Sequence, residues 1–289
     1  MPDISASLQN HATAAAIHRL WAHSVAVVNS VRVIGKDPVT NRRGDAEEFG
    51  SGAALRWGDH QFILTAKHIL AGAGPCDLRI FWRPSGSMER RAPAELRRQD
   101  VVDATPITNE NASIIRCEWE DLAIIDVVPD TEGQHVEFFD LGNNWIDPPE
   151  GERVHCFGFP SDSKIPWEKR MVGKKEERTL AIYPGVFDGK VMRSPSFPTS
   201  DFNPDIHYLI PFEDAARGKD PHGYSGAAAW SESNQRQIIW HPNFKFAGTC
   251  THSYRNGSFE RVIKASAVRH FVEESFGEGK LRPGQKTFV

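Results

Sequence analysis

The chain contains 289 residues, of which 39% are hydrophobic and 25% charged, so it can bury a substantial core as one large domain or two compact lobes. Its formal net charge of −4 argues against a nucleic-acid partner, because proteins that bind phosphate backbones normally carry a basic surface. The sequence has no run of about 18 consecutive apolar residues, so neither a membrane span nor a membrane partner is expected.

Residues 5–22 place apolar side chains at helical spacing, which predicts an N-terminal helix. From about residue 24 the pattern changes to short β-type segments separated by Gly, Pro, Asn and Asp. The predicted strands are 24–28, 53–57, 62–65, 78–82, 122–128, 153–157, 179–183, 207–210, 227–230, 246–251 and 259–264. A final helix is predicted over 266–275. Many short strands between terminal helices, without regular strand–helix alternation, indicate a mainly β fold of the barrel or sandwich type.

Turn-forming residues concentrate near 140–152 and divide the strands into two sets of similar size. Two polar stretches, 161–177 and 196–206, are predicted to be exposed loops. The predicted organisation is an extension over 1–23, a first domain over 24–145, a second over 146–265, and a C-terminal helix and tail over 266–289.

The amino-terminal region does not have the features of a secretory signal, because it lacks a cationic start and polar residues interrupt its apolar stretch. The four cysteines stand far apart and form no CxxC pair; they are Cys76, Cys117, Cys156 and Cys250. Without an export signal, free thiols in a reducing compartment are expected. These features predict a cytoplasmic protein.

The first motif is a Gly-Ser-Gly turn at 50–52 that leads through a strand–hairpin–strand segment into Thr-Ala-Lys-His, which ends at His68. This segment resembles the trypsin-like serine peptidases, whose catalytic histidine follows a Thr-Ala pair at a strand end. The Gly-Ser-Gly turn is similar to the HtrA and glutamyl-endopeptidase branches, and Ile69 stands where a cysteine is usual, as in the disulfide-poor bacterial branches. An isolated histidine is more often a buried structural imidazole, but this frame favours catalysis.

The second motif places Asp121 directly before Leu-Ala-Ile-Ile, which resembles the segment that carries the family's triad aspartate. A carboxylate in that role holds the imidazole and stabilises the imidazolium formed during reaction. A surface turn before a strand is the alternative interpretation, since Asp is common there. Glu120 competes for the role, but a long side chain at that position is expected to be solvated.

The third motif is Gly-Tyr-Ser-Gly-Ala at 223–227, which resembles the family's nucleophile loop around Ser225. Gly223 and Gly226 let the backbone turn so that the amides of Gly223 and Ser225 point at one place, the oxyanion hole. Two residues depart from the family pattern: Tyr224 replaces the usual Asp or Asn, and Ala227 replaces the usual Gly or Ser. The alternative is a glycine-rich turn between strands.

The chain order of the three motifs supports this assignment. His68 precedes Asp121 by 53 residues, and Asp121 precedes Ser225 by 104. An α/β-hydrolase would show the order Ser, Asp, His, and a subtilisin would show Asp, His, Ser. Only 64 residues follow Ser225, which is too few for the remaining sheet and acid of an α/β-hydrolase.

The resemblance covers roughly residues 24–275 and includes a Val-x-x-x-Gly-Phe-Pro segment at 154–160 that is similar to an HtrA strand. It implies two six-stranded antiparallel β-barrels, the first carrying His68 and Asp121 and the second carrying Ser225, without a PDZ domain. It also implies a serine endopeptidase that needs no metal or cofactor and acts on a protein or peptide substrate.

The family's primary substrate pocket is shaped by residues just before the nucleophile and by the strand after it. The corresponding positions are Lys219, Asp220, His222, Thr249, Cys250, Thr251 and His252. Asp220 at the pocket base would favour Lys or Arg substrates, whereas Lys219 or His252 would favour acidic ones. The alternative is that these three are exposed loop charges. Thr251 also occupies the place where the family often puts a hydroxyl near the triad aspartate.

Two further hypotheses follow from the resemblance. One is a trypsin-like scaffold without catalysis, which only Tyr224 supports. The other is a regulated component of a bacterial stress or defence pathway with a regulatory protein partner, for which residues 5–22 and 161–177 are candidate docking or autolysis segments.

Overall fold

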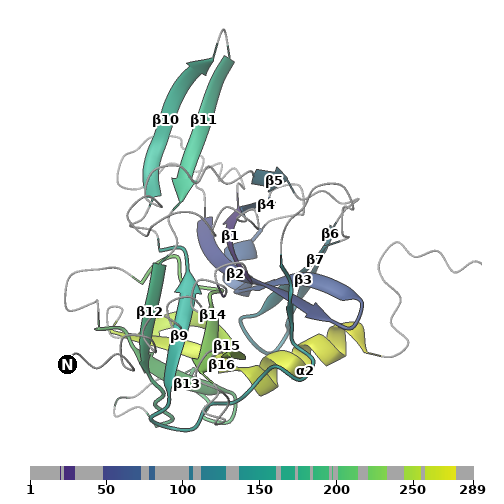
Figure 1. The fold of residues 1–289 in the computed structure, drawn as a ribbon, viewed down its shortest axis with the longest axis vertical. Helices are drawn as coiled ribbons and strands as arrows, with labels where there is room; N and C mark the ends of the chain where they lie inside the picture. The colour runs from purple at the N-terminus through teal and green to yellow at the C-terminus, as the bar shows by residue number, and fades with distance from the viewer. Residues whose placement is uncertain are drawn as a thin grey trace, which may run out of the picture.

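The computed structural model of the chain contains two large, mainly antiparallel β-sheets, a small two-stranded sheet and a C-terminal helix, which confirms the mainly β, chymotrypsin-like fold class (Figure 1). The residues that the structure describes are 20, 23–29, 48–72, 78–81, 104–106, 112–127, 137–160, 164–172, 175–182, 185–194, 197, 201–213, 221–232, 244–254 and 258–277. Within these ranges no helix is both long and apolar enough to cross a membrane. Of the helix predicted over 5–22, only Leu20 falls inside them.

The first sheet has the order β5-β4-β1-β2-β3-β7-β6, and the short β8 pairs parallel to β2. Its strands are β1 (Ser24–Asn29), β2 (Glu48–Trp57), β3 (His60–Thr65), β4 (Leu78–Phe81), β5 (Ala104–Pro106), β6 (Ala112–Arg116), β7 (Ala123–Val127) and β8 (Phe139–Asp140). Every residue of β7 is buried, because the alternating side chains of this strand enter two different apolar clusters on its two faces.

The second sheet has the order β12-β9-β14-β15-β16-β13. Its strands are β9 (Arg153–Gly158), β12 (Gly185–Lys190), β13 (His207–Pro211), β14 (Ala228–Glu232), β15 (Phe244–Tyr254) and β16 (Phe259–Lys264). The segment between β8 and β9 connects the two sheets. Trp145 of this segment forms a parallel bridge to Phe246 of β15. The pairing of β14 with β15 and of β15 with β16 is interrupted by register shifts, which bend the strands as a curled sheet requires.

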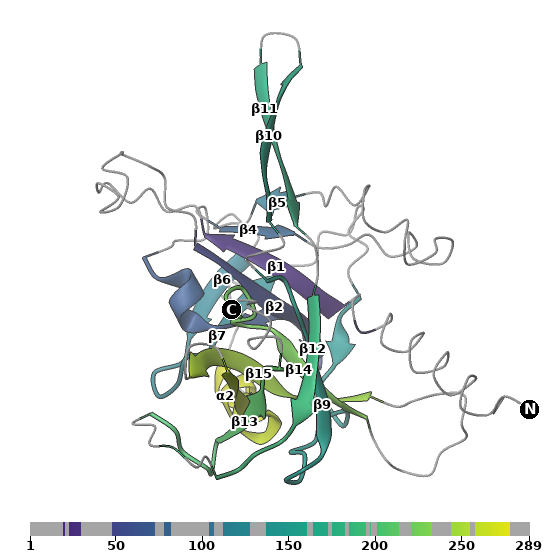
Figure 2. The ribbon, with the colours of Figure 1, turned by 90° about the vertical axis from the view of Figure 1, so that its left-hand side faces the viewer.

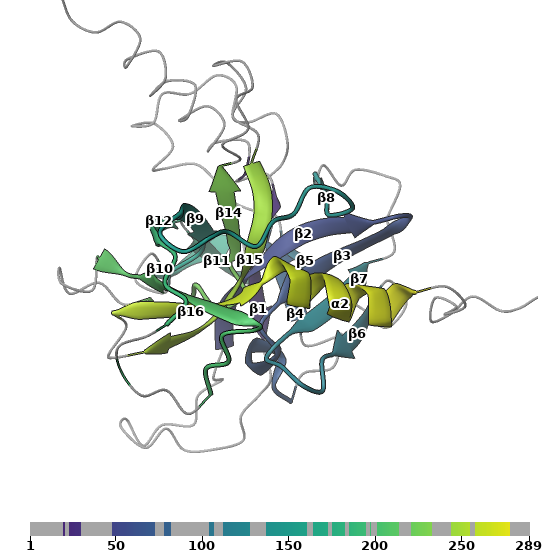
Figure 3. The same cartoon turned by 90° about the horizontal axis from the view of Figure 1, so that it is seen from below.

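The two sheets pack on each other through one buried apolar cluster that draws residues from both, including Leu55, Phe62, Trp230 and Phe246. Helix α2 (Ala265–Phe276) continues directly from β16 and lies across this junction (Figure 3). Its apolar side enters the same cluster, and Phe276 near its end stacks on His60 of the first sheet with 4.3 Å between ring centroids. Because the helix packs against both sheets, it helps to fix the position of one sheet relative to the other.

Residues 161–177 differ from the sequence prediction of an exposed loop. β10 (Lys164–Val172) and β11 (Lys175–Ile182) form a separate two-stranded antiparallel sheet. This hairpin projects away from both larger sheets (Figures 1 and 2). β5, β6, β8 and β12 were also not among the predicted strands. The cysteines inside the described ranges, Cys117, Cys156 and Cys250, are buried and free, and Cys76 lies outside those ranges.

Candidate active site

His68 lies in a short 3-10 helix, η2 (Lys67–Leu70), that follows β3. Neighbouring segments hold this turn from two sides. The Asn29 side-chain amide donates hydrogen bonds to the carbonyls of Ile69 and Ala71 at 3.0 and 3.1 Å, and the Lys67 ammonium donates to the carbonyl of Cys117 at 2.8 Å. Because the apolar residues after His68 point into the first sheet, the imidazole is presented outward, with 42% of its side-chain area exposed.

Asp121 contacts His68 through both carboxylate oxygens. Nδ1 of His68 is 2.7 Å from Oδ2 of Asp121, and the backbone N–H of His68 donates to Oδ1 at 2.9 Å. Burial by itself would raise the pKa of Asp121, but the hydrogen bonds and charge of His68 and the nearby guanidinium of Arg261 lower it below its ordinary value. The carboxylate is therefore ionised near neutral pH and fixes Nδ1 as the protonated ring nitrogen.

Glu120 is not solvated, contrary to the sequence expectation. Its side chain is only 10% exposed, and its Oε2 lies 3.0 Å from Nε2 of His207. The N–H of Asn203 donates to Nδ1 of the same imidazole at 3.0 Å, so Nε2 carries the proton that is donated to Glu120. Arg261 approaches the other carboxylate oxygen at 3.7 Å. Glu120 and Asp121 thus have different partners, and only Asp121 touches His68 through a described contact.

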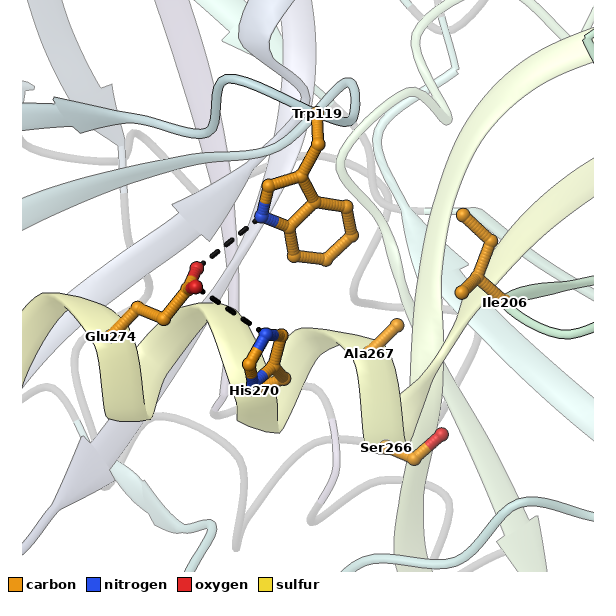
Figure 4. Close-up of a pocket in the computed structure, with 6 residues that line it drawn as sticks. All are labelled: Trp119, Ile206, Ser266, Ala267, His270 and Glu274. Atoms are coloured by element: carbon orange, nitrogen blue, oxygen red, sulfur yellow. Dashed lines mark hydrogen bonds and ion pairs between the residues drawn. The ribbon is translucent and has the colours of Figure 1, made fainter.

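The segment between β6 and β7 is anchored at three consecutive residues. Trp119 donates its indole N–H to Glu274 of α2 at 3.3 Å, next to an open pocket of about 420 Å³ that this tryptophan lines together with α2 (Figure 4). Glu120 binds the second sheet, and Asp121 binds His68. Three separate partners leave this segment little freedom, which fixes the position of the Asp121 carboxylate.

The pair formed by Glu120 and His207 leads to a prediction about acid stability. Burial would raise the pKa of Glu120, but the hydrogen bond from His207 and the charge of Arg261 lower it. A carboxyl group whose pKa is lower in the folded state stabilises the protein above its unfolded pKa, and this contribution disappears as the pH falls through the folded value. Glu120→Gln should therefore cost about 1–3 kcal/mol near pH 7, and the difference from the wild type should shrink below about pH 5.

Urea unfolding between pH 3 and 7 measures this difference. Glu118→Gln is the matched control, since Glu118 is an exposed carboxylate in the same segment and its replacement should change stability little at any pH. A cost of Glu120→Gln that stays constant with pH would contradict the prediction.

The loop around Ser225 turns at two glycines in the left-handed region, Gly223 with φ 96° and Gly226 with φ 87°. Backbone hydrogen bonds tie this loop to both sheets. The Ser225 carbonyl accepts from the Ser51 N–H at 2.7 Å, and the Gly226 N–H donates to the Cys250 carbonyl at 2.7 Å. These hydrogen bonds restrain the shape of the loop. Ser225 itself is half-buried at the surface.

Strand β2 brings the Ser225 loop to the side of the first sheet that carries His68. A Cβ atom placed on Gly50 of β2 would lie 2.7 Å from the side chain of Ile69 and 3.0 Å from the Ser225 carbonyl. The residue after His68 and the nucleophile loop therefore meet across this glycine, which has no side chain to separate them. Three motifs that are far apart in the sequence converge at one junction between the sheets.

Gly226 has no room for a side chain, which gives a second prediction. Its Cβ would overlap the backbone carbonyl of Ser51 and lie 2.6 Å from the Thr65 hydroxyl, and its φ also disfavours an L-residue. Gly226→Ala should lower the free energy of unfolding by more than about 3 kcal/mol. Gly58→Ala is the control, because Gly58 also has a positive φ of 57° but nothing lies within 4 Å of its Cβ, so only about 1 kcal/mol should be lost. Thermal unfolding compares the two, and equal losses would contradict the steric argument.

Tyr224 points away from the site and into the core of the second sheet. Its side chain is 4% exposed and makes edge-to-face contacts with Phe187 and Phe212 at centroid distances of 4.8 and 6.0 Å. The aromatic residue that departs from the family pattern therefore anchors the loop by burial of apolar area. This position of the ring explains how a tyrosine can precede Ser225 without entering the site.

The predicted substrate-pocket residues fall into three groups. Thr249, Cys250 and Thr251 are fully buried, and the Thr251 hydroxyl accepts a hydrogen bond from Arg261 at 3.3 Å. His222 and His252 are exposed. Lys219 and Asp220 lie outside the described residues. Their roles in substrate binding stay predictions.

Sequence reasoning did not single out His207, Arg261 or Asn29 as parts of the site. Arg261 donates to Asp201 at 2.9 Å, contacts Thr251, and approaches Glu120, so one guanidinium links the 201–206 turn to the segment that carries Asp121. The available signal was the predicted strand 259–264 itself, in which three of the six residues are charged. Among the described residues, no cluster of three or more His, Cys, Asp or Glu side chains is arranged to hold a metal ion.

The two curled sheets and the C-terminal helix match the chymotrypsin-like fold. Solved structures similar to this chain include human heparin binding protein, with a TM-score of 0.50, 12% identity, and coverage of 93% of this chain and 96% of that chain. Protease Anisep from Arthrobacter nicotinovorans has a TM-score of 0.47 and 12% identity, and covers 86% of this chain and 93% of its own.

Catalytically inactive tobacco etch virus protease in complex with substrate has a TM-score of 0.43 and 12% identity, with coverage of 89% and 85%. No family model and no curated protein matches the sequence. At these identities the similarity concerns the fold alone.

Proposed function

We propose that this protein is a serine endopeptidase that cleaves protein or peptide substrates through an acyl-enzyme, with His68, Asp121 and Ser225 as its triad. The observation that carries the proposal is the 2.7 Å contact between Nδ1 of His68 and the Asp121 carboxylate, on the exposed face next to the Ser225 loop. His68 keeps 42% of its side-chain area exposed while it contacts the carboxylate, so its imidazole is accessible to a substrate, as a general base requires.

The proposed reaction uses each group in one role. The Ser225 hydroxyl attacks the scissile carbonyl while Nε2 of His68 accepts its proton, and the imidazolium then gives that proton to the leaving amine. Asp121 holds Nδ1–H and stabilises the imidazolium. Water enters by the same route, hydrolyses the acyl-enzyme and regenerates Ser225.

The N–H groups of Gly223 and Ser225 are proposed as the oxyanion hole. Within the described part of the chain, neither N–H donates a hydrogen bond to another protein group. Buried or half-buried backbone donors are normally paired, so two such donors on a loop bounded by glycines suit a site that stabilises a developing negative charge.

The wider assignment rests on the same site and on the sequence motifs. We propose that the chain belongs to an HtrA-like or glutamyl-endopeptidase-like branch and acts in the bacterial cytoplasm under the control of a protein partner in a stress or defence pathway. Lys219, Asp220, His222 and the 249–252 segment are the proposed primary pocket.

Hydrolysis of an unfolded protein such as reduced casein distinguishes an active peptidase from a scaffold without catalysis. The wild type should release peptides, with no loss of activity in the presence of a metal chelator. A folded wild-type protein that releases none, alone or with candidate activating partners, would favour the scaffold. Sequencing of the released peptides would then identify the residue that the primary pocket selects.

A further inference from the structure

Ser51 is the centre of the Gly-Ser-Gly motif, which was predicted to be a turn but lies inside strand β2 and pairs with β1. The residue is fully buried between the two sheets. Its hydroxyl donates to the Gly223 carbonyl at 2.5 Å and accepts from the N–H of Phe159 at 2.8 Å. Its own N–H donates to the Ser225 carbonyl at 2.7 Å. One residue of the first sheet therefore holds the carbonyls of Gly223 and Ser225, the two residues proposed to line the oxyanion hole.

These contacts restrain Gly223, the residue of the loop whose backbone has the most conformational freedom. A glycine rotates freely about φ and ψ, so the direction of the Gly223 N–H depends on what restrains its neighbouring peptide groups. The hydroxyl of Ser51 fixes the carbonyl of Gly223, and the N–H of Ser51 fixes the carbonyl of Ser225. Each of these carbonyls belongs to the peptide group that follows the N–H of the same residue. The peptide group that carries the Ser225 N–H therefore lies between two restrained neighbours, and the one that carries the Gly223 N–H has one restrained neighbour, so rotation of both N–H groups is limited.

We propose that the Ser51 hydroxyl is a positioning residue for the oxyanion hole. This inference rests on the proposed function and deepens it. Ser51 touches no reacting atom and acts through Gly223. Oxyanion stabilisation depends on donors that already point at the developing charge, so loss of the restraint should weaken binding of the transition state more than binding of the substrate.

The test compares Ser51→Ala, Ser51→Cys and the wild type in steady-state peptide hydrolysis. Ser51→Ala should lower kcat by about 10- to 100-fold, a part of the loss caused by removal of a whole oxyanion donor, with KM changed by less than about threefold. Ser51→Cys retains a weak donor and should fall between the two. The pH dependence of kcat/KM should keep its midpoint, because the His68–Asp121 contact is untouched.

Thr65→Val is the matched control. The Thr65 hydroxyl is equally buried and donates to the carbonyl of the same Ser51 at 2.6 Å, but it forms no described hydrogen bond to the Ser225 loop. Its removal should cost stability comparable to that lost in Ser51→Ala while leaving kcat within about threefold of the wild type. Equal kcat losses in Thr65→Val and Ser51→Ala would assign Ser51 to general stability and overturn the proposal.

Amide hydrogen exchange over residues 221–227 provides a readout that does not need activity. Exchange should be faster in Ser51→Ala than in Thr65→Val. Wild-type kcat and unchanged exchange in Ser51→Ala would overturn the proposal. An inactive wild type in which Ser51→Ala still accelerates exchange would refute the proposed function but retain the restraint on the loop, so the two failures are distinguishable.

Discussion

Ser225→Ala and His68→Ala are each expected to reduce kcat by about a millionfold, and the double variant should be no worse than either single one. The reason is that the two side chains act as one unit: the hydroxyl is a weak nucleophile without the imidazole, and the imidazole has no proton to accept without the hydroxyl. Residual activity in all three variants should be the same and should come from substrate binding and the oxyanion hole.

Single-turnover and steady-state peptide hydrolysis measure these losses. Circular dichroism should show that the variants are folded, since both side chains are partly exposed and neither fills the core. Losses that multiply in the double variant would mean that Ser225 and His68 act independently, which is incompatible with nucleophile and base.

Asp121→Asn is expected to lower kcat by about 10⁴-fold while leaving the fold intact. Asparagine preserves the shape of the side chain, but it has no charge to stabilise the imidazolium. It can also present an N–H to Nδ1, which would favour the wrong tautomer of His68. The effect should appear mainly in kcat, because Asp121 interacts with the base and not with the substrate.

Glu120→Gln is the control for Asp121→Asn, because it changes the neighbouring carboxylate in the same way. Glu120 binds His207, so its replacement should reduce stability and leave kcat within a few-fold of the wild type. A large kcat loss in Glu120→Gln with a small one in Asp121→Asn would assign the triad acid to Glu120.

Local motifs predicted much of the fold because barrel strands alternate between core and surface or run as short apolar segments. The segments that became β7, β9, β13 and β16 were found in this way, and the mainly β class followed from them. The same motifs pointed to His68 and Asp121, which the structure places in hydrogen-bond contact. Their catalytic roles stay predictions.

Strand β10 and the first part of β11 could not be predicted from apolar alternation, whereas the end of β11 overlaps the strand predicted over 179–183. The two strands pair only with each other in the described structure, and their polar sequence does not show the alternation that marks a half-buried strand. Polar residues at 161–177 therefore indicated a loop.

The partners of Glu120 could not be predicted for a different reason. His207 is 87 residues away in sequence, and Arg261 lies on another strand of the second sheet. A buried ion network forms only when the sheets pack, whereas local sequence suggests that a glutamate before a strand is solvated. Ser51 is an intermediate case, since its motif was recognised but its bonds to Gly223 and Phe159 depend on the tertiary fold.

Reaction with a fluorophosphonate probe, followed by peptide mass mapping, tests directly whether Ser225 is a nucleophile that His68 activates. The probe forms a covalent bond to a serine hydroxyl only when a base activates it and an oxyanion hole accepts the phosphoryl oxygen. We expect a single adduct on Ser225 in the wild type, and none in Ser225→Ala or His68→Ala. Folded wild-type protein that acquires no adduct at Ser225, or an adduct at Ser225 that persists in His68→Ala, would contradict this expectation.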